Sequence, residues 1–208
     1  MRMFRPILIT AGATRNPIDA MRFISAFSTG ATGAWLAEKL TTERDVQVFG
    51  SPEALMRCGE GFRKQAFTST DDLMQKVQDW VTNQPNGVLV HAAAVGDYAI
   101  APQPGKIQSG QPELVLKLRP TPKILDAVRG WSDTVQIVSF KAAPPGTTSS
   151  ELERLAQAQG ERSDSALVFA NVIGELESNV LIWSREESMS FDHRTDALAA
   201  LAERIVTL

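Results

Sequence analysis

A chain of 208 residues with 43% hydrophobic and 22% charged residues has the composition of an ordinary soluble globular fold, and its length favours a single domain, 1–208. The net charge of -3 disfavours a nucleic-acid-binding surface. The one cysteine, Cys58, cannot form an internal disulfide, and no apolar run approaches the roughly 20 residues of a membrane span. The apolar stretch in residues 1–10 is too short for a signal peptide. We therefore expect a cytoplasmic protein that binds neither nucleic acid nor membrane.

The first half of the chain alternates short apolar runs with segments of helical periodicity. The expected strands are 6–10, 45–50 and 87–95, and the expected helices are 30–43, 51–58 and 70–83. Capping residues mark the helix starts: Ser28 or Thr29, Ser51 followed by Pro52, and Thr70. Such alternation predicts a parallel sheet with helices on both faces.

The second half departs from this rhythm. Residues 98–113 are rich in Pro, Gly and Gln and predict a long loop, and 113–120 alternates like a half-exposed strand. The other expected elements are helix 121–128 (Thr121 as N-cap, Pro122 first), strand 134–140, helix 149–159, strands 165–173 and 179–184, a hairpin partner at 187–191, and helix 193–206. The sequence thus predicts an α/β protein, a Rossmann-like three-layer sandwich with a mainly parallel central sheet.

Unusual residues follow four of the expected strands, and ligands of open parallel sheets bind beyond the carboxyl ends of the strands. A glycine turn before a helix brings backbone N–H groups close to a phosphate, but the same turn is commonly structural, so both interpretations stay open. The candidates are Gly12 and Arg15 after the first strand, Asp97 after the alanines at 92–94, Phe140, and Asn171.

The segment 28–33, STGATG, has the same two interpretations. The hydroxyls of Ser28 and Thr29 with helix N–H groups suit a phosphate cradle, whereas Gly30 and Gly33 suit close packing of a helix on the sheet. Cationic side chains nearby suit phosphate or carboxylate binding, although each alone is more often a solvated surface residue. These cations are Arg15 and Arg22, and Lys106 in the long loop is a further candidate that could neutralise a triphosphate.

Several familiar sites are absent from the sequence. It contains no dinucleotide-binding glycine pattern, no Walker A lysine, no metal-ligand cluster and no Ser/His/Asp arrangement. The strand at 45–50 is followed by no acidic residue for a ribose, which disfavours an NAD site. His91 lies within a strand and is expected to be a core or edge histidine.

Taken together, the motifs of the chain resemble those of the phosphopantothenoylcysteine synthetase family. This family is the synthetase half of a bifunctional flavoprotein of coenzyme A biosynthesis. The resemblance covers roughly residues 7–183. It is carried, in the family's order, by ILITAGATRNPIDAMRFIS, STGATG, HAAAVGDY, GKI, LKLRPTPKIL, VSF and FAN.

The resemblance implies a ligase that condenses 4'-phosphopantothenate with cysteine. The expected co-substrate is CTP, or else ATP, with Mg²⁺, and the carboxylate is activated as an acyl-nucleotide. The resemblance also implies a homodimer, without a flavin in this chain, and a separate flavoprotein decarboxylase as a candidate partner.

Site residues follow from matched positions. The resemblance assigns Arg22 and Lys106 to catalysis and no residue to a metal. The nucleotide side comprises Gly12, Ala92, Ala93, Asp97, Lys106, Thr121, Pro122 and Phe140. The substrate side comprises Arg15, Arg22, Ser28, Thr29, Gly30 and Asn171.

The segment after the first arginines departs from the family pattern. Where the pattern has Asn-x-Ser-Ser-Gly-Lys-Met-Gly, this chain has AFSTGATG. Ala26 therefore replaces an Asn implicated in the second half-reaction, and Ala31 replaces a Lys.

Charges are also missing on the phosphate side. Gln108 replaces a basic residue, the segment after Phe140 lacks a Glu, and Gln159 and Ser163 align with two lysines expected to face the triphosphate. Each lost cation removes about 1.5–3 kcal/mol of charge-assisted hydrogen bonding unless it is replaced. Lys141 and Arg162 are candidate replacements.

Three functions remain open on the sequence alone. The first is the ligase or an altered version of it. The second is a non-catalytic or regulatory paralogue that binds a nucleotide or phosphorylated ligand. The third, a nucleotide-sugar or dinucleotide-binding protein, is disfavoured by the missing ribose acid. Ala26 and Ala31 divide the first two.

Overall fold

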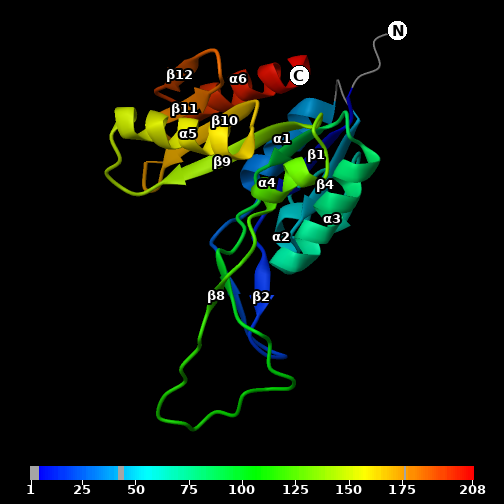
Figure 1. Ribbon diagram of the computed structural model, residues 1–208, viewed down its shortest axis with the longest axis vertical. Helices are drawn as coiled ribbons and strands as arrows, with labels where there is room; N and C mark the ends of the chain where they lie inside the picture. Colours follow the sequence, from blue (N-terminus) through cyan, green and yellow to red (C-terminus); the bar gives the residue numbers. More distant parts are fainter. Residues whose placement is uncertain (1–4, 42–44, 176) are drawn as a thin grey trace.

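The computed structural model describes residues 5–41, 45–175 and 177–208 and is built on an eight-stranded sheet in the order β12-β11-β10-β9-β6-β1-β4-β5 (Figure 1). Its strands are β1 (Ile7–Ala11), β4 (Val46–Gly50), β5 (Arg63–Ala66), β6 (Val88–His91), β9 (Gln136–Ala143), β10 (Leu167–Val172), β11 (Val180–Trp183) and β12 (Ser188–Phe191). Neighbouring strands pair in parallel except in β10–β11 and β11–β12. The predicted Rossmann-like fold with a mainly parallel sheet is confirmed.

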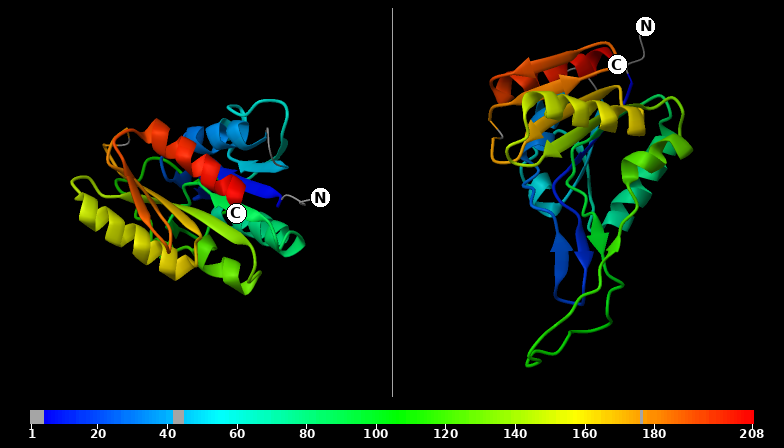
Figure 2. Two further views of the ribbon diagram at one scale, coloured as in Figure 1. Left: turned by 90° about the horizontal axis from the view of Figure 1, so that it is seen from above. Right: turned by 60° about the vertical axis from the view of Figure 1, so that its left-hand side comes forward.

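Helices cover both faces of the sheet and complete the three layers (Figure 2). One face packs against α1 (Ala31–Thr41), α2 (Pro52–Leu55) and α6 (Arg194–Thr207). The other packs against α3 (Thr70–Asn83), α4 (Ile124–Ala127), the short 3₁₀ turn η1 (Val128–Gly130) and α5 (Ser149–Ser163). The central strands, such as β1, β6 and β10, are buried along their whole length, and they are mainly apolar because helices cover both sides. Within the described ranges, no helix is long and apolar enough to span a bilayer.

A long arm projects from the carboxyl edge of this sheet (Figure 1). We define the arm as residues 15–25 and 98–120. In it, β2 (Arg15–Pro17) pairs with β3 (Phe23–Ser25), and β7 (Tyr98–Ala99) pairs with β8 (Arg119–Pro120), each antiparallel. The arm exposes large apolar side chains, namely Met21, Phe23, Tyr98, Leu114, Val115 and Leu118.

The predicted strand 113–120 is wrong over most of its length. Only Arg119–Pro120 pairs with another strand, and Leu114 and Leu118 are exposed. Alternation of apolar residues makes a strand only where a second backbone lies alongside, and for 113–118 the described residues provide none. The sequence also failed to predict β5, which is polar, and the β2–β3 hairpin, whose strands are three residues each.

Three helix starts are confirmed, and one of them is the start of α5 at Ser149. Ser51 caps α2, because its hydroxyl accepts a hydrogen bond from Ala54 N at 3.3 Å. His193 is the N-cap residue of α6, at the predicted boundary. The predicted end of the helix at residues 42–43, and residues 1–4 of the N-terminal segment, lie outside the described residues.

Three other helix starts differ from the prediction. The first helix begins at Ala31, after Gly30 adopts a φ of 75°, a conformation incompatible with a right-handed helix. Ser69, not Thr70, caps α3. Lys123, not Thr121, is the N-cap residue of α4, because the Thr121 hydroxyl instead donates to Gly96 O at 2.6 Å.

Candidate functional site

A cavity of about 170 Å³ opens at the carboxyl edge of β6 and β9. It lies beside the point where the strand order reverses, since β1 is followed by β4 on one side and has β6 on the other. Open α/β sheets bind ligands at such points. The lining residues are His91, Ala93, Val95, Asp97, Thr121, Lys123, Ile124, Leu125, Phe140, Gln159 and Arg162.

The cavity lining is fixed near the sheet by hydrogen bonds between β1 and β6. The backbone N–H of Ala93 donates to Thr10 Oγ1 at 3.2 Å, and Thr10 Oγ1 lies 2.9 Å from His91 Nδ1. Burial lowers the pKa of His91 to about 4, so its imidazole is neutral at neutral pH. The prediction was a core or edge histidine, and the exposed fraction of His91, 6%, places it in the core.

Polar groups border the cavity on the side of α4. The backbone N–H of Thr121 donates to Asp97 O at 2.9 Å, which joins the two predicted nucleotide-side segments. The carboxylate of Asp97 forms an ion pair with Lys123, and both side chains are more than half exposed. Sequence reasoning missed Lys123, although it stands directly after the matched Thr-Pro turn.

The opposite wall comes from α5. The amide of Gln159 donates to Ser139 Oγ at 3.0 Å and to Phe140 O at 3.1 Å. Arg162 lies one turn further along α5 and forms an ion pair with Asp126 of α4. Both Gln159 and Arg162 line the cavity. Arg162 therefore brings a cation to the wall where the expected lysine has become Gln159.

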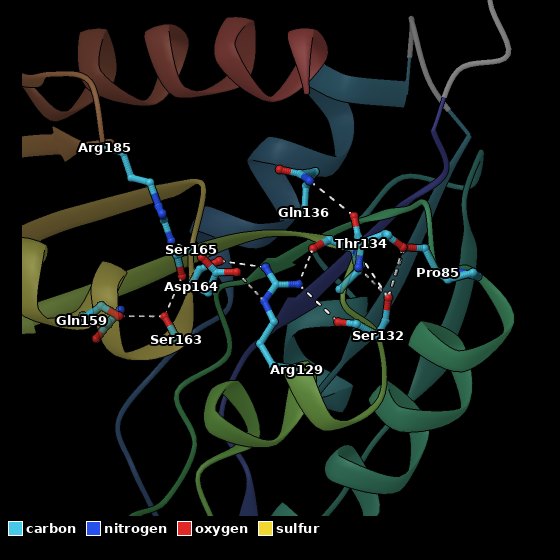
Figure 3. A network of polar contacts seen from close by, with 11 residues as sticks. Pro85, Arg129, Ser132, Thr134, Gln136, Gln159, Ser163, Asp164, Ser165 and Arg185 are labelled. Carbon is cyan, nitrogen blue, oxygen red and sulfur yellow. Dashed lines mark hydrogen bonds and ion pairs between the residues drawn. The ribbon is translucent and has the colours of Figure 1, made fainter.

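A single arginine joins the two helical walls behind the cavity. Figure 3 shows Arg129, which follows α4, surrounded by backbone oxygens and by Asp164 at the end of α5. Its guanidinium donates to Val135 O at 2.9 Å and to Asp164 O at 2.8 Å, and its Nε lies 2.8 Å from the Asp164 carboxylate. This network joins the turn after α4 to the end of α5.

The two glycine turns noted in the sequence lie against each other. A Cβ at Gly30 would lie 3.1 Å from Gly12 N and 2.3 Å from Ala54 Cβ, and one at Gly12 would lie 2.2 Å from Ser51 Oγ. Both glycines also have positive φ. Their packing role is therefore clear, since no other residue fits between β1, α1 and α2.

The hydroxyls of the predicted phosphate cradle face the start of α1. Ser28 Oγ accepts from Gly30 N at 3.3 Å, and Thr29 Oγ1 accepts from Ala31 N at 3.4 Å. Ala26 and Ala31 are both exposed, so side chains at these positions would be accessible to a ligand.

The predicted cations Arg22 and Lys106 lie in the arm. Asp19 brings them together: its carboxylate accepts from Arg22 Nη1 at 2.6 Å and from Ile107 N, beside Lys106, at 3.0 Å. The N–H groups of Ile107, Met21 and Arg22 lower the pKa of Asp19 to about 2.

The remaining predicted cation, Arg15, forms an ion pair with Glu53 and lies 4.9 Å from the Phe23 ring centroid. None of Arg15, Arg22 and Lys106 lines the cavity of this single chain. The predicted residues that do line it are Ala93, Asp97, Thr121 and Phe140, whereas Gly12, Ala92, Pro122, Ser28, Thr29, Gly30 and Asn171 lie outside it.

Across the sheet from α5, Asn171 contacts a residue that sequence reasoning missed. Arg194 Nη1 donates to Asn171 Oδ1 at 3.2 Å, and Nη2 donates to Thr32 Oγ1 at 3.0 Å. No local pattern marks Arg194, because its partners come from distant parts of the chain.

Comparison with known proteins identifies relatives of the whole chain. The family model for the DNA/pantothenate metabolism flavoprotein C-terminal domain matches residues 4–206. The coenzyme A biosynthesis bifunctional protein CoaBC of Thermococcus kodakarensis is 33% identical over 96% of this chain and 49% of its own length. CoaBC of Escherichia coli is 29% identical over 81% of this chain and 41% of its own length. The chain thus spans about half the length of these curated relatives or less.

Solved structures share the fold. The DNA/pantothenate metabolism flavoprotein from Streptococcus pneumoniae superposes with a TM-score of 0.86 at 23% identity, covering 99% of both chains. The C-terminal domain of CoaBC superposes with a TM-score of 0.77 at 21% identity, covering 98% of this chain and 94% of that one. At these identities the likeness establishes the fold alone. On the family match over 4–206, the chain belongs to the DNA/pantothenate metabolism flavoprotein C-terminal domain family, the phosphopantothenoylcysteine synthetase family that the sequence resembles.

Proposed function

We propose that this chain is a phosphopantothenate–cysteine ligase of coenzyme A biosynthesis, with CTP as the expected nucleotide and ATP as the other candidate. The observation that carries the proposal is the cavity at the carboxyl edge of β6 and β9. In a chain of this family, it gathers Ala93, Asp97, Thr121 and Phe140 from three separate matched segments.

The proposed reaction has two steps. A carboxylate oxygen of 4'-phosphopantothenate attacks the α-phosphorus of the nucleotide, and pyrophosphate leaves. The cysteine nitrogen then attacks the acyl carbon, which releases the nucleoside monophosphate and a proton. In such reactions the protein mainly positions the reactants and neutralises charge.

The site offers two adjoining regions for the two reactants. We assign the nucleotide to the cavity, where Asp97 and Thr121 offer polar contacts to its sugar or base and Arg162 offers a cation to its phosphates. We assign the acyl substrate to the edge near the start of α1, where the Ser28 and Thr29 hydroxyls accept from Gly30 N and Ala31 N and can still donate their own protons to a ligand.

A divalent cation would enter with the nucleotide. The described part of the chain contains no group of three acidic, histidine or cysteine side chains able to hold a metal ion. Mg²⁺ usually needs few protein ligands because substrate phosphates and water complete its octahedron.

The arm supports the proposal of a homodimer. Large apolar side chains along it are exposed in the single chain, and exposed apolar patches commonly mark interaction sites. Arg22 and Lys106 lie on this arm, and neither lines the chain's own cavity. We propose that a second copy packs on the arm, and that these cations serve the reaction within the dimer.

A non-catalytic paralogue is the second candidate. The exposed alanines at 26 and 31 favour it, because they remove an amide and a charge from the segment beside α1. Such a protein would bind the nucleotide or a phosphorylated ligand without completing the ligation.

One assay separates the two candidates. The protein is incubated with 4'-phosphopantothenate, Mg²⁺ and either CTP or ATP, with and without cysteine. Pyrophosphate release and the phosphopantothenoylcysteine mass are expected with cysteine. An acyl-nucleotide that accumulates even with cysteine would assign the defect to the second step. If calorimetry detects no nucleotide binding and no product forms, the ligase proposal fails.

Ala26→Asn tests whether the rest of the site is intact. If only the missing amide limits the second step, the variant should speed the conversion of the acyl-nucleotide to product. Ala158→Asn is the matched control, since Ala158 is an exposed alanine of α5 outside both the substituted segment and the arm. Equal rates for wild type and Ala26→Asn would show that Ala26 is not the limiting change.

A further inference from the structure

Arg194 lies where three elements meet at the carboxyl edge of the sheet. It is the first residue of α6, its partner Asn171 lies near the end of β10, and its partner Thr32 is the second residue of α1. The guanidinium also lies 5.0 Å from the centroid of the Phe169 ring. These contacts hold its charge in one position.

Among the described residues, no carboxylate lies within ion-pair distance of the Arg194 guanidinium. Its hydrogen bonds reach an amide oxygen and a hydroxyl, and none of the ion pairs between described residues includes it. Burial lowers the pKa of Arg194, and the more distant carboxylate of Glu177 opposes this effect. A half-buried cation is normally paired, so the arrangement is incomplete without an anion.

The position of Arg194 also suits a ligand that reaches the cavity. The ring of Phe169 beneath it lies 5.3 Å from the ring of Phe140, which lines the cavity. Thr32 belongs to the first turn of α1, and the positive end of this helix attracts anions. Two of the five guanidinium N–H donors bond to described residues, and the others suit phosphate oxygens.

We propose that Arg194, oriented by Asn171 and Thr32, binds a phosphate group of the ligand at the edge between α1 and α6. The phosphate belongs either to the acyl substrate or to the nucleotide. This inference deepens the proposed function and rests on it. Arg194 would supply the cation beside the start of α1, where Ala31 supplies none.

Calorimetric titration of the full chain tests this. The probes are 4'-phosphopantothenate, unphosphorylated pantothenate, and CTP. Arg194→Gln should weaken one phosphate-bearing probe by about tenfold or more, and Arg194→Lys should restore part of the loss. A loss of affinity for 4'-phosphopantothenate but not for pantothenate assigns the site to the ester phosphate. A loss of affinity for CTP assigns it to the nucleotide.

Controls separate this role from a structural one. Arg185→Gln removes an exposed cation that pairs with Asp164, and it should leave all affinities unchanged. Thr32→Val removes only the orienting hydroxyl and should cause a smaller loss of affinity for the same probe. This variant tests the site even if Arg194→Gln fails to fold. Thermal unfolding identifies the variants that remain folded.

The outcomes distinguish this inference from the proposed function. If wild type ligates and folded Arg194→Gln has unchanged KM and affinities, the phosphate site is overturned while the ligase stands. If wild type does not ligate but binds a phosphate-bearing probe through Arg194, the ligase fails while the site stands. Failure of wild type to bind any phosphate-bearing probe overturns the site.

Discussion

Thr10 and His91 are paired residues on the adjacent strands β1 and β6, with Thr10 Oγ1 2.9 Å from His91 Nδ1. The hydroxyl already accepts the N–H of Ala93, so its own proton is available to Nδ1. This assignment places the imidazole proton on Nε2 and keeps the ring neutral. The cavity lining is therefore built on an uncharged histidine.

His91 should make the protein less stable in mild acid. Its pKa is about 4 when folded against 6.5 as the reference value, so the unfolded chain binds the proton more readily. The contribution of the neutral His91 to the free energy of unfolding is fully present above pH 6.5 and is lost as the pH falls toward 4. Between pH 7 and pH 5 the free energy of unfolding should fall by about 2 kcal/mol. Urea unfolding at the two pH values measures it.

The matched variants are His91→Gln and His193→Gln, which replace the two histidines of the chain. His91→Gln should reduce the loss of stability between the two pH values, whereas His193→Gln should keep it. An equal pH dependence in wild type and His91→Gln would contradict the prediction.

The buried framework could be predicted from the sequence because its signals are local. Strands such as Ile7–Ala11 are short apolar runs, and the apolar stripe of α3 is formed by Leu73, Val77, Trp80 and Val81, all buried. Ser51 caps its helix through contacts three residues away. Each of these features depends on neighbours in the chain.

The features that the sequence did not predict depend on residues far away in the chain. Residues 113–118 have the alternation of a strand, yet the arm gives them no neighbouring strand to pair with. β5 is polar, but β4 pairs with it at the sheet edge. Arg194 meets Thr32 across 162 positions of sequence, a relationship that no local pattern encodes.

The arm should loosen when Asp19 is replaced. The carboxylate holds three backbone N–H groups and Arg22, so Asp19→Asn removes the charge that these donors share. Hydrogen–deuterium exchange should then speed up at Ile107, Met21 and Arg22, with the sheet unchanged. Because the pKa of Asp19 is depressed to about 2, the same loosening in wild type should begin only as the pH falls below 3.8.

Asp45→Asn is the control for this change. Asp45 forms an exposed ion pair with Arg63 outside the arm, and its loss should leave exchange in the arm unaltered. Unchanged exchange at Ile107 in Asp19→Asn would show that the carboxylate does not hold the arm.

Gly160 should tolerate no side chain. A Cβ there would lie 2.0 Å from Cζ3 of Trp183, so Gly160→Ala must push α5 away from β11. We expect a loss of about 1–3 kcal/mol in the free energy of unfolding. Gly130→Ala is the control, since no atom lies within 4 Å of its Cβ position, and its stability should change little. Equal stability of the two variants would contradict this packing argument.

Arg162 should replace the cation that the cavity wall has lost at Gln159. It lines the cavity from the same helix and is anchored by Asp126, so a bound triphosphate would compete for its guanidinium. Arg162→Gln should weaken CTP binding by about tenfold, as expected for loss of a charge-assisted hydrogen bond. Arg154→Gln removes an exposed arginine of α5 that pairs with Glu151, and it should bind CTP like wild type.

Gln159→Lys should strengthen CTP binding. The gain should be larger in the Arg162→Gln background, because the new lysine then substitutes for the lost arginine. Equal CTP affinities for Arg162→Gln and Arg154→Gln, measured by calorimetry, would place the nucleotide phosphates away from this wall.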